Sequence, residues 1–412
     1  MRSAATSCCE NRAVLSTGIG VPQLQLCCCS WRAIPSTVSE GTLQWCCYYE
    51  LYPHEQRRER KIHYLLAHPL RRPLPLTRSR AMSGSSPFVV AVVCPAGVPA
   101  LAQLPSIDGV EFIVANTLTD FQASPSLPST QALMFIATGG DAALMSPLLE
   151  ACPEVKWCHS LFAGVDTLAP FIAEKLASSD VPLTNGKGAF SDSLAEYVLA
   201  AALHFNKKVP ELLANRAAKN WDKFVMPTLA GKTMGFVGFG HIGQTTAAVA
   251  KAFGMNIMAL RRHPAKAGEG GLADVTLGPA DKLRLFEESD FVVSVLPGTP
   301  ETANFCGTAE FAAMKESAVF ISVGRGMVVD EDALAEALST KSIAGAALDV
   351  FKVEPLPEAS ALWQQENLLL TAHNADYTDD YFALGWKIWR DNYDAVAAGT
   401  PLPTLVDTAT GY

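Results

Sequence analysis

The stretch KTMGFVGFGHIGQTTAAVA, residues 232–250, decides the fold because it joins an apolar run to a helical pattern through closely spaced glycines. Residues 233–239 form a short run rich in apolar or β-branched residues, which predicts a buried strand. Residues 241–253 follow with the spacing of an amphipathic helix. Three apolar residues share one face of that helix: Ile242, Val249 and Phe253. The stretch therefore predicts a strand, a glycine turn and a helix.

The glycines of this turn suit the binding of a pyrophosphate. Gly238 permits a tight turn, Gly240 lets backbone N–H groups approach an anion, and Gly243 lets the helix pack close to the strand. The N-terminus of the helix, at His241 and Ile242, adds partial positive charge. We therefore expect a dinucleotide-binding unit here. The alternative is an ordinary tight turn with no ligand.

Length and composition restrict the classes of protein. The chain has 412 residues, of which 49% are hydrophobic, so it can bury a large core and form two or three domains. No apolar run approaches the roughly 18–20 residues that a bilayer span needs, and we expect no membrane insertion. The net charge is −9, and we find no basic stripe that would bind nucleic acid.

Residues 1–81 differ from the rest of the chain. They contain 11 Lys or Arg and five Asp or Glu, a net charge of +6, which leaves −15 for the remainder. Ten of the 11 basic residues are Arg, and only one acidic residue precedes residue 40. This composition is typical of an organelle transit peptide. Two alternatives stay open: a disordered extension, or translation that begins upstream of a true start at Met82.

The cysteines follow the same division. Seven of the 11 lie in residues 1–81, and the body holds only four scattered ones: Cys94, Cys152, Cys158 and Cys306. Scattered cysteines without C-x-x-C spacing favour a reducing compartment and argue against a disulfide framework or a structural metal site.

The body alternates short apolar runs with helical patterns, which predicts parallel strands joined by helices. The first series of expected strands covers residues 88–94, 111–117, 132–138 and 155–161. The second series covers residues 233–239, 256–262, 291–297, 318–324, 343–351 and 368–373. A long connecting helix is expected at residues 191–205, with Ser191 or Ser193 as its N-cap. The fold class is therefore α/β, with two doubly wound parallel sheets.

Two arginines end the strand that follows the glycine turn. Where a fold that prefers NAD usually carries an acidic residue for the ribose hydroxyls, this chain has Arg261 and Arg262. Guanidinium groups suit the 2′-phosphate of NADP. We therefore expect NADP as the preferred cofactor, with NAD as the second option. The alternative is that both arginines are solvated and one forms a salt bridge.

Five motifs in sequence order carry a resemblance to a known family. They are LAGKTMGFVGFGHIG at 229–243, SDFVVSVLPGTPETANF at 289–305, FISVGRGMVVDEDALAEAL at 320–338, AGAALDVFKVEPLP at 344–357 and LLLTAHNA at 368–375. Together they resemble the D-isomer-specific 2-hydroxyacid dehydrogenases over roughly residues 85–410. The nearest resemblance is to the glyoxylate and hydroxypyruvate reductases that use NADPH.

The resemblance implies three catalytic residues, and the reduction of a 2-oxo acid needs groups of these kinds. His373 is the general acid in reduction and the general base in oxidation. Glu354 binds the far imidazole nitrogen and orients His373. Arg325 pairs with the substrate carboxylate and polarises the carbonyl. Each residue also has a purely structural alternative, as a helix cap, a solvated acid or a ligand of backbone carbonyls.

The resemblance also implies residues that bind the two ligands. The expected cofactor contacts beyond the glycine turn and the arginine pair are Pro297, Thr302, Val323 and Asp349, the last one to the nicotinamide amide. Ala163 and Gly164, in LFAGVD, are expected to receive the substrate carboxylate opposite Arg325. Asp349 could instead be a structural cap, and LFAGVD a plain turn. The chain departs from the family pattern at Ser322, where many members have Asn, and at Ala372, where the histidine usually follows Pro.

The implied architecture is a Rossmann cofactor domain inserted in a flavodoxin-like substrate domain. We expect the substrate domain at residues 84–186 plus 375–412, with a last helix at 381–399, and the cofactor domain at 187–374. Residues 204–223 resemble the segment through which family members form homodimers.

The expected function is hydride transfer between NAD(P)H and a small 2-oxo acid, to give a D-2-hydroxy acid. Two alternatives remain: a dinucleotide-binding scaffold like the corepressors built on this fold, or an enzyme like phosphoglycerate dehydrogenase. We expect a cytoplasmic location, or a mitochondrion or plastid if residues 1–81 are a transit peptide.

Overall fold

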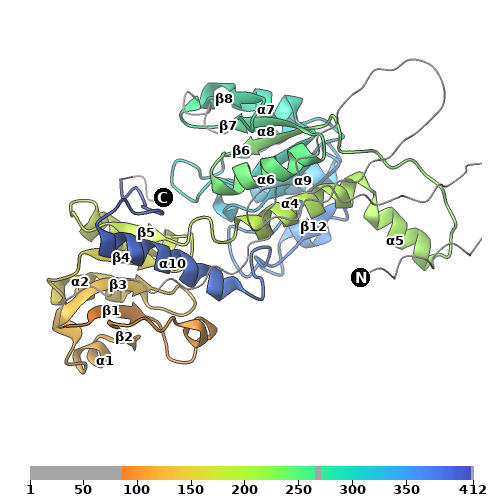
Figure 1. Ribbon diagram of the computed structural model, residues 1–412. Helices are drawn as coiled ribbons and strands as arrows, with labels where there is room; N and C mark the ends of the chain where they lie inside the picture. Colours follow the sequence, from red (N-terminus) through yellow and green to blue (C-terminus); the bar gives the residue numbers. More distant parts are fainter. Residues whose placement is uncertain (1–85, 265–270, 410–412) are drawn as a thin grey trace, which may run out of the picture. The chain divides into compact units, whose positions relative to one another are not determined.

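The computed structural model describes residues 86–264 and 271–409, which form two parallel β-sheets (Figure 1). The expectations for residues 1–81 lie outside these ranges. Within the described part of the chain, no helix is both long enough and apolar enough to cross a membrane.

The first sheet has five strands in the order β2-β1-β3-β4-β5, and every neighbouring pair is parallel. This is the flavodoxin-like order, in which the chain starts near the centre and reverses direction once. The strands are β1 (Phe88–Val93), β2 (Val110–Ala115), β3 (Thr130–Phe135), β4 (Trp157–Ser160) and β5 (Leu183–Asn185).

Alternate residues of these strands serve two separate cores, because successive side chains in a strand point to opposite faces. Val89, Ala91 and Val93 pack on the side of the helices α1 (Leu118–Gln122), α2 (Met145–Ala151) and α3 (Ala169–Phe171). Val90 and Val92 pack on the side of α10 (Tyr381–Ala398), which supplies Trp386, Trp389 and Tyr393. The Trp386 indole N–H donates to the carbonyl of Ala100 at 2.8 Å. The C-terminal helix therefore returns to cover the first sheet.

The second sheet has seven parallel strands in the order β12-β11-β10-β9-β6-β7-β8. Read from β8, this is the doubly wound order of dinucleotide-binding folds with one further strand. The strands are β6 (Thr233–Val237), β7 (Asn256–Leu260), β8 (Val275–Leu277), β9 (Phe291–Ser294), β10 (Val319–Ser322), β11 (Gly345–Leu348) and β12 (Leu368–Leu370). The two sheets confirm the predicted fold class.

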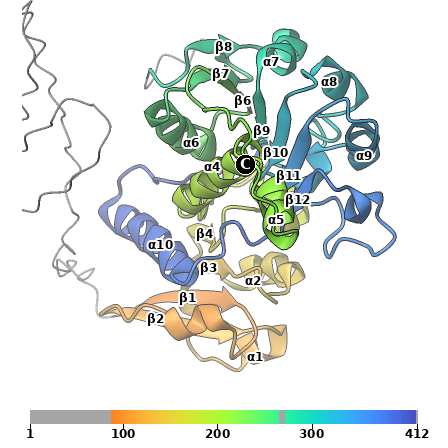
Figure 2. The same cartoon turned by 90° about the vertical axis from the view of Figure 1, so that its right-hand side faces the viewer.

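Helices cover both faces of the second sheet (Figure 2). The helices α4 (Ser191–Asn206) and α6 (His241–Ala252) pack on one face. The opposite face is covered by α7 (Lys282–Glu288), α8 (Thr308–Ala313) and α9 (Glu331–Ser339). The helix α5 (Val209–Ala217) follows α4 and has no buried residue.

Three details of the sequence prediction are wrong. The edge strands β5 and β8 were not predicted, because three residues are too few to show a pattern. Val249 in α6 and Phe253, which directly follows α6, are exposed, and the buried face of the helix consists of the small residues Gly243, Thr246, Ala247 and Ala250. Neither Ser191 nor Ser193 caps α4; the N-cap position is Phe190, and the Ser193 hydroxyl instead donates to the carbonyl of Ala375.

Candidate active site

The glycine turn after β6 has the backbone that its residues predict. Gly238 has φ = +92°, a left-handed conformation that a side chain would strain. A Cβ there would also lie 2.9 Å from Cδ2 of Leu296. A Cβ on Gly243 would lie 3.2 Å from the Gly238 carbonyl oxygen, so α6 packs closely against the turn. Both positions therefore need glycine for local steric reasons.

The start of α6 fits an anion. Gly240 is the N-cap, and as a glycine it offers no side-chain acceptor to the N–H groups of the first turn of the helix. A Cβ on Gly240 would meet nothing within 4 Å, so there is open space beside the helix end. The N–H groups of His241, Ile242 and Gly243 can therefore receive a pyrophosphate. The open space and the N–H groups at the start of α6 therefore fit the pyrophosphate of the dinucleotide that the sequence predicts.

The two arginines after β7 are placed differently. Arg261 is half-buried, and its backbone N–H donates to the carbonyl of Leu277 on β8. Arg262 is exposed, and its Nη2 lies 2.6 Å from Oε2 of Glu301. The salt bridge that the sequence left open as an alternative is thus present at Arg262. A 2′-phosphate would have to share this guanidinium with Glu301.

Hydrogen bonds to neighbouring backbone groups fix the loop after β9 and the residue after β10. The Thr302 hydroxyl lies 2.7 Å from the carbonyl of Pro297, to which it donates, and accepts from the backbone N–H of Thr299 at 2.9 Å. Val323 is buried, and its N–H donates to the carbonyl of Ser294. These residues shape the edge of the candidate cofactor site through backbone placement.

Arg325 follows β10 in a loop that two glycines allow to pack closely. A Cβ on Gly324 would lie 2.6 Å from the Leu296 carbonyl oxygen, and one on Gly326 would lie 1.8 Å from the carbonyl carbon of Phe351. Backbone atoms cannot move aside as a flexible side chain can. The sequence VGRG therefore holds Arg325 between the ends of β9 and β11.

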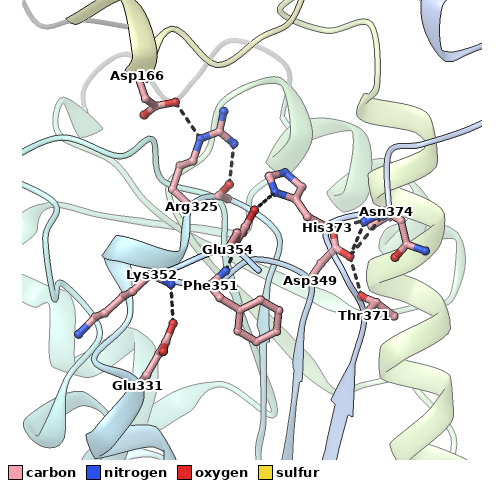
Figure 3. Close-up of polar contacts among 12 residues, drawn as sticks. Asp166, Arg325, Glu331, Asp349, Phe351, Lys352, Glu354, Thr371, His373 and Asn374 are labelled. Carbon is pink, nitrogen blue, oxygen red and sulfur yellow. Dashed lines mark hydrogen bonds and ion pairs between the residues drawn. The ribbon is translucent and has the colours of Figure 1, made fainter. Parts of the chain in front are cut away.

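The Arg325 guanidinium contacts the loop after β4. Its Nε donates to Oδ2 of Asp166 at 3.0 Å, and its Nη1 donates to the Gly324 carbonyl at 2.9 Å (Figure 3). A Cβ on Gly164 would lie 1.9 Å from Nη2, so the guanidinium lies directly against this glycine. The same loop is held by Asn185, whose amide donates to the Ala163 carbonyl at 2.6 Å. The structure thus brings Arg325 to the two residues expected to share the substrate carboxylate.

His373 and Glu354 form a hydrogen-bonded pair. Nδ1 of His373 lies 2.7 Å from Oε2 of Glu354, and Oε1 of Glu354 accepts from the backbone N–H of Phe351 at 2.9 Å (Figure 3). His373 has φ = +51°, and its N–H donates to the Asp349 carbonyl at 2.8 Å. About two fifths of the His373 side chain is exposed (40%). The hydrogen bond at Nδ1 therefore orients the imidazole, and the ring stays accessible to solvent.

Phe351 connects this pair to Arg325. Glu354 binds the backbone N–H of Phe351, and Gly326, which follows Arg325, packs on the Phe351 carbonyl. The three predicted catalytic residues thus meet around one short segment at the end of β11. They come from three loops that are far apart in the sequence.

The buried carboxylate of Asp349 has protein partners. Its Oδ1 accepts from the Thr371 hydroxyl at 2.6 Å and from the N–H groups of Asn374 and Ala375 at 3.1 and 3.2 Å. These bonds pin the segment that carries His373. The structural role that the sequence left open is therefore present, while the contact to a nicotinamide amide stays a prediction.

Sequence reasoning missed two acidic residues. Asp166 ends the quoted motif LFAGVD, but the motif gave no sign that this carboxylate reaches Arg325. Asp376 follows His373 by three residues, and the charges of His373 and Arg325 both act on its carboxyl group. Its closeness in sequence to His373 was the one available signal.

Known proteins with similar sequences and structures agree on one family. Residues 199–375 match the model described as D-isomer specific 2-hydroxyacid dehydrogenase, NAD binding domain. Glyoxylate/hydroxypyruvate reductase B of Enterobacter sp. (strain 638) is 35% identical over 250 residues, which are 59% of this chain and 75% of that protein.

Two solved structures extend the similarity to nearly the whole described part. One is an NADPH-dependent glyoxylate/hydroxypyruvate reductase from Sinorhizobium meliloti in complex with NADP and sulfate. It is 26% identical with a TM-score of 0.65 and covers 79% of this chain and 100% of its own. The other is a D-isomer specific 2-hydroxyacid dehydrogenase from Xanthobacter autotrophicus Py2 in complex with NADPH and MES. It is 27% identical with a TM-score of 0.66 and covers 80% and 100%.

Proposed function

The chain belongs to the D-isomer-specific 2-hydroxyacid dehydrogenase family, and from this premise we propose that it reduces glyoxylate or hydroxypyruvate with NADPH. The product is the 2-hydroxy acid, of D configuration where C2 is chiral. The observation that carries the proposal is the meeting of the His373–Glu354 pair with Arg325, which itself lies against Gly164. Relatives named as reductases favour this enzyme over a corepressor-like scaffold or a phosphoglycerate dehydrogenase.

The catalytic roles follow from the hydrogen bonds of each residue. Glu354 accepts from Nδ1 of His373 and so leaves Nε2 to give a proton to the carbonyl oxygen of the substrate. Reduction requires that His373 be an imidazolium before the carbonyl oxygen gains charge. The Glu354 carboxylate stabilises this imidazolium. In the oxidative direction, Nε2 takes the proton back.

Arg325 holds the substrate carboxylate. Its Nε and Nη1 already donate to Asp166 and Gly324, so the remaining N–H groups on Nη1 and Nη2 are those left to bind the substrate. Backbone N–H groups of Ala163 and Gly164 complete this site. A carboxylate held there orients the adjacent carbonyl toward His373.

The cofactor binds at the glycine turn of the second sheet. The pyrophosphate is held by Gly240 and the start of α6, the adenosine side by Pro297 and Thr302, and the 2′-phosphate by Arg261 and Arg262, with Val323 as a further cofactor contact. When bound, NADPH supplies the hydride for C2 of the substrate. Two structural neighbours, 26% and 27% identical, were solved in complex with NADP and NADPH, which supports NADP over NAD.

We assign the first sheet, at residues 84–186 plus 375–412, to a substrate domain and residues 187–374 to a cofactor domain. The return of α10 to the first sheet supports this division. The contact between Arg325 and residues 163–166 supports closure of the two domains on the substrate, which excludes water from the reaction.

We also propose a homodimer formed through residues 204–223. Large apolar side chains are exposed on this segment and just beyond it: Leu212, Leu213, Trp221, Val225 and Met226. Trp221 is fully exposed, at 100%, which is unusual for so large an apolar side chain. Light scattering should report two chains for the wild type and one for a Leu213→Asp variant.

We propose a cytoplasmic location, or an organelle if residues 1–81 direct import. Cys94, Cys152, Cys158 and Cys306 are buried as free thiols, which suits a reducing compartment. A fluorescent fusion of the full chain, compared with one that begins at Met82, would distinguish the two locations.

The test of function is NADPH oxidation by the purified chain with a panel of 2-oxo acids. We expect glyoxylate and hydroxypyruvate to be reduced, and NADPH to be used faster than NADH. If neither nucleotide is consumed with any acid of the panel, the proposal is wrong.

A further inference from the structure

The loop that is expected to receive the substrate carboxylate is held by the end of β5. The side-chain amide of Asn185, the last residue of β5, donates from Nδ2 to the Ala163 carbonyl at 2.6 Å. The N–H of the next residue, Gly186, donates to the Phe162 carbonyl at 3.1 Å. Two successive carbonyl groups of the loop are therefore fixed by two successive residues at the end of one strand.

These two carbonyl groups determine where two N–H groups point. The Phe162 carbonyl shares its peptide unit with the Ala163 N–H, and the Ala163 carbonyl shares its unit with the Gly164 N–H. Both peptide bonds are trans, and in a trans peptide the C=O and the N–H point in opposite directions. The bonds from residues 185 and 186 therefore orient the two N–H groups that are expected to bind the substrate.

The two N–H groups lie beside Arg325 and are open to a ligand. Within residues 86–264 and 271–409, neither the Ala163 N–H nor the Gly164 N–H donates a hydrogen bond to another residue. A Cβ on Gly164 would lie 1.9 Å from Nη2 of Arg325, so this part of the loop is in contact with the guanidinium. A carboxylate at this position can therefore accept hydrogen bonds from the backbone and from the guanidinium together.

The amide of Asn185 is itself held in one orientation. Asn185 is buried, with 5% of its surface exposed, and its Oδ1 accepts from the backbone N–H of Lys187 at 3.3 Å. This bond leaves Nδ2 as the group that faces Ala163. The backbone N–H of Asn185 donates to the Thr404 carbonyl at 3.3 Å, and its carbonyl accepts from the Thr404 hydroxyl at 2.6 Å. Asn185 is therefore a fixed support for the loop.

These contacts point to a role for Asn185 in substrate binding. We propose that Asn185 is a positioning residue, which through the Ala163 carbonyl aims the Gly164 N–H at the substrate carboxylate. The bond to the carbonyl also polarises the peptide unit, so that its N–H becomes a stronger donor. Asn185 acts through this peptide and not by contact with the substrate. The inference rests on the proposed function, because it uses the same place for the substrate carboxylate.

Two variants remove the amide donor in different ways. Asn185→Leu keeps the shape of the side chain and adds no charge, whereas Asn185→Asp keeps an acceptor for the Lys187 N–H. The loss common to both variants is the donor to the Ala163 carbonyl.

The ligand for the binding test is oxamate, whose carboxylate and adjacent carbonyl copy those of a 2-oxo acid. Calorimetry on the full chain with NADPH should show that both variants bind oxamate at least about tenfold more weakly than the wild type. If only Asn185→Asp weakens the binding, the cause is its charge and the proposal is wrong.

Asn392→Ala is the matched control. Asn392 is buried in α10, which covers the same sheet, and its amide donates to the Ile388 carbonyl at 2.8 Å and to the Thr404 hydroxyl at 2.9 Å. The variant therefore also loses buried amide bonds, and its Tm should fall, but oxamate should bind within about twofold of the wild type. If Asn392→Ala weakens oxamate binding as much as Asn185→Leu does, the effect is a general loosening of the fold and the proposal is wrong.

Steady-state kinetics distinguish positioning from a purely structural role. The carboxylate is bound alike before and during hydride transfer, so Asn185→Leu should raise KM for hydroxypyruvate about tenfold and leave kcat within about threefold of the wild type. A loss of folded protein alone would lower kcat and leave KM unchanged. An unchanged KM in Asn185→Leu would overturn the positioning role.

Failure of this inference and failure of the proposed function are distinguishable. If no 2-oxo acid is reduced but oxamate binding depends on Asn185, the proposed function fails and the positioning role stands. Unchanged oxamate binding in both variants, or no binding of oxamate by the wild type, overturns the role of Asn185 whether or not 2-oxo acids are reduced.

Discussion

The cofactor side and the substrate side of the site are built in different ways. At the glycine turn, backbone atoms make the site: Gly238 has a positive φ, and a Cβ on Gly243 would lie 3.2 Å from the Gly238 carbonyl oxygen, five residues away. At the substrate side, residues from loops after β4, β10, β11 and β12 come together: Gly164, Asp166, Arg325, Glu354 and His373. Local sequence therefore specifies the first region, and tertiary structure specifies the second.

The largest effect should come from the substrate side. His373→Ala removes the proton donor, and kcat for hydroxypyruvate should fall by about 10²- to 10⁴-fold. The dissociation constant of NADPH, measured by fluorescence titration, should stay within about twofold of the wild type. A parallel loss of NADPH binding would show that the two regions are not separable in this way.

The next effect should appear on the cofactor side. Gly238→Ala places a methyl group at φ = +92° and 2.9 Å from Leu296, so the turn must distort. NADPH should bind about tenfold more weakly, since strain of this kind costs about 1–2 kcal/mol. Gly231→Ala is a control for backbone strain, since Gly231 also has positive φ and has open space around its Cβ position. Equal weakening in both variants would contradict a specific role for the Gly238 turn.

A smaller effect should follow from the salt bridge of Arg262. Glu301→Gln removes the carboxylate that lies 2.6 Å from the Arg262 guanidinium. The guanidinium can then interact more strongly with a 2′-phosphate. The dissociation constant of NADPH should fall about two- to threefold and that of NADH should not change, because an exposed pair contributes little. An equal gain for both nucleotides would exclude a contact between Arg262 and the phosphate.

The smallest effect should be on stability at Asp376. Burial raises the pKa of this carboxyl group, against the charges of His373 and Arg325 and with that of Asp349. Its ionisation is therefore a cost that is absent below about pH 4, the usual range of an Asp, and grows as the pH rises through the higher pKa of the folded state.

The variant Asp376→Asn should accordingly unfold at a slightly higher Tm than the wild type at neutral pH. This gain should disappear in acid. Thermal unfolding of Asp376→Asn at both pH values measures the difference, with Asp379→Asn, at an exposed position three residues further along, as the control. A gain of the same size at both pH values would contradict the role of ionisation.

The sequence predicted the fold where the local pattern is long and regular. The central strands of both sheets were predicted because continuous apolar runs such as residues 88–94 and 291–297 are typical of strands buried on both faces. The short edge strands β5 and β8 were missed. The face of α6 was predicted wrongly because Val249 and Phe253 are apolar, whereas close packing on the sheet needs the small residues Gly243 and Ala247.

The candidate site was predictable only through motifs. His373, Glu354 and Arg325 stand in recognisable sequences, and the structure brings them together around Phe351. The pairing of Arg325 with Asp166 joins residues 159 positions apart, and the environment of Asp376 depends on a helix and three loops. Neither contact leaves a local pattern in the chain.

The most direct test of the account is a crystal structure of the protein with NADP and oxamate. The account predicts the oxamate carboxylate at Arg325 and the N–H groups of residues 163 and 164. The carbonyl oxygen should lie within about 2.6–3.2 Å of Nε2 of His373. Oxamate bound elsewhere, or with its carboxylate at His373 and away from Arg325, would contradict it.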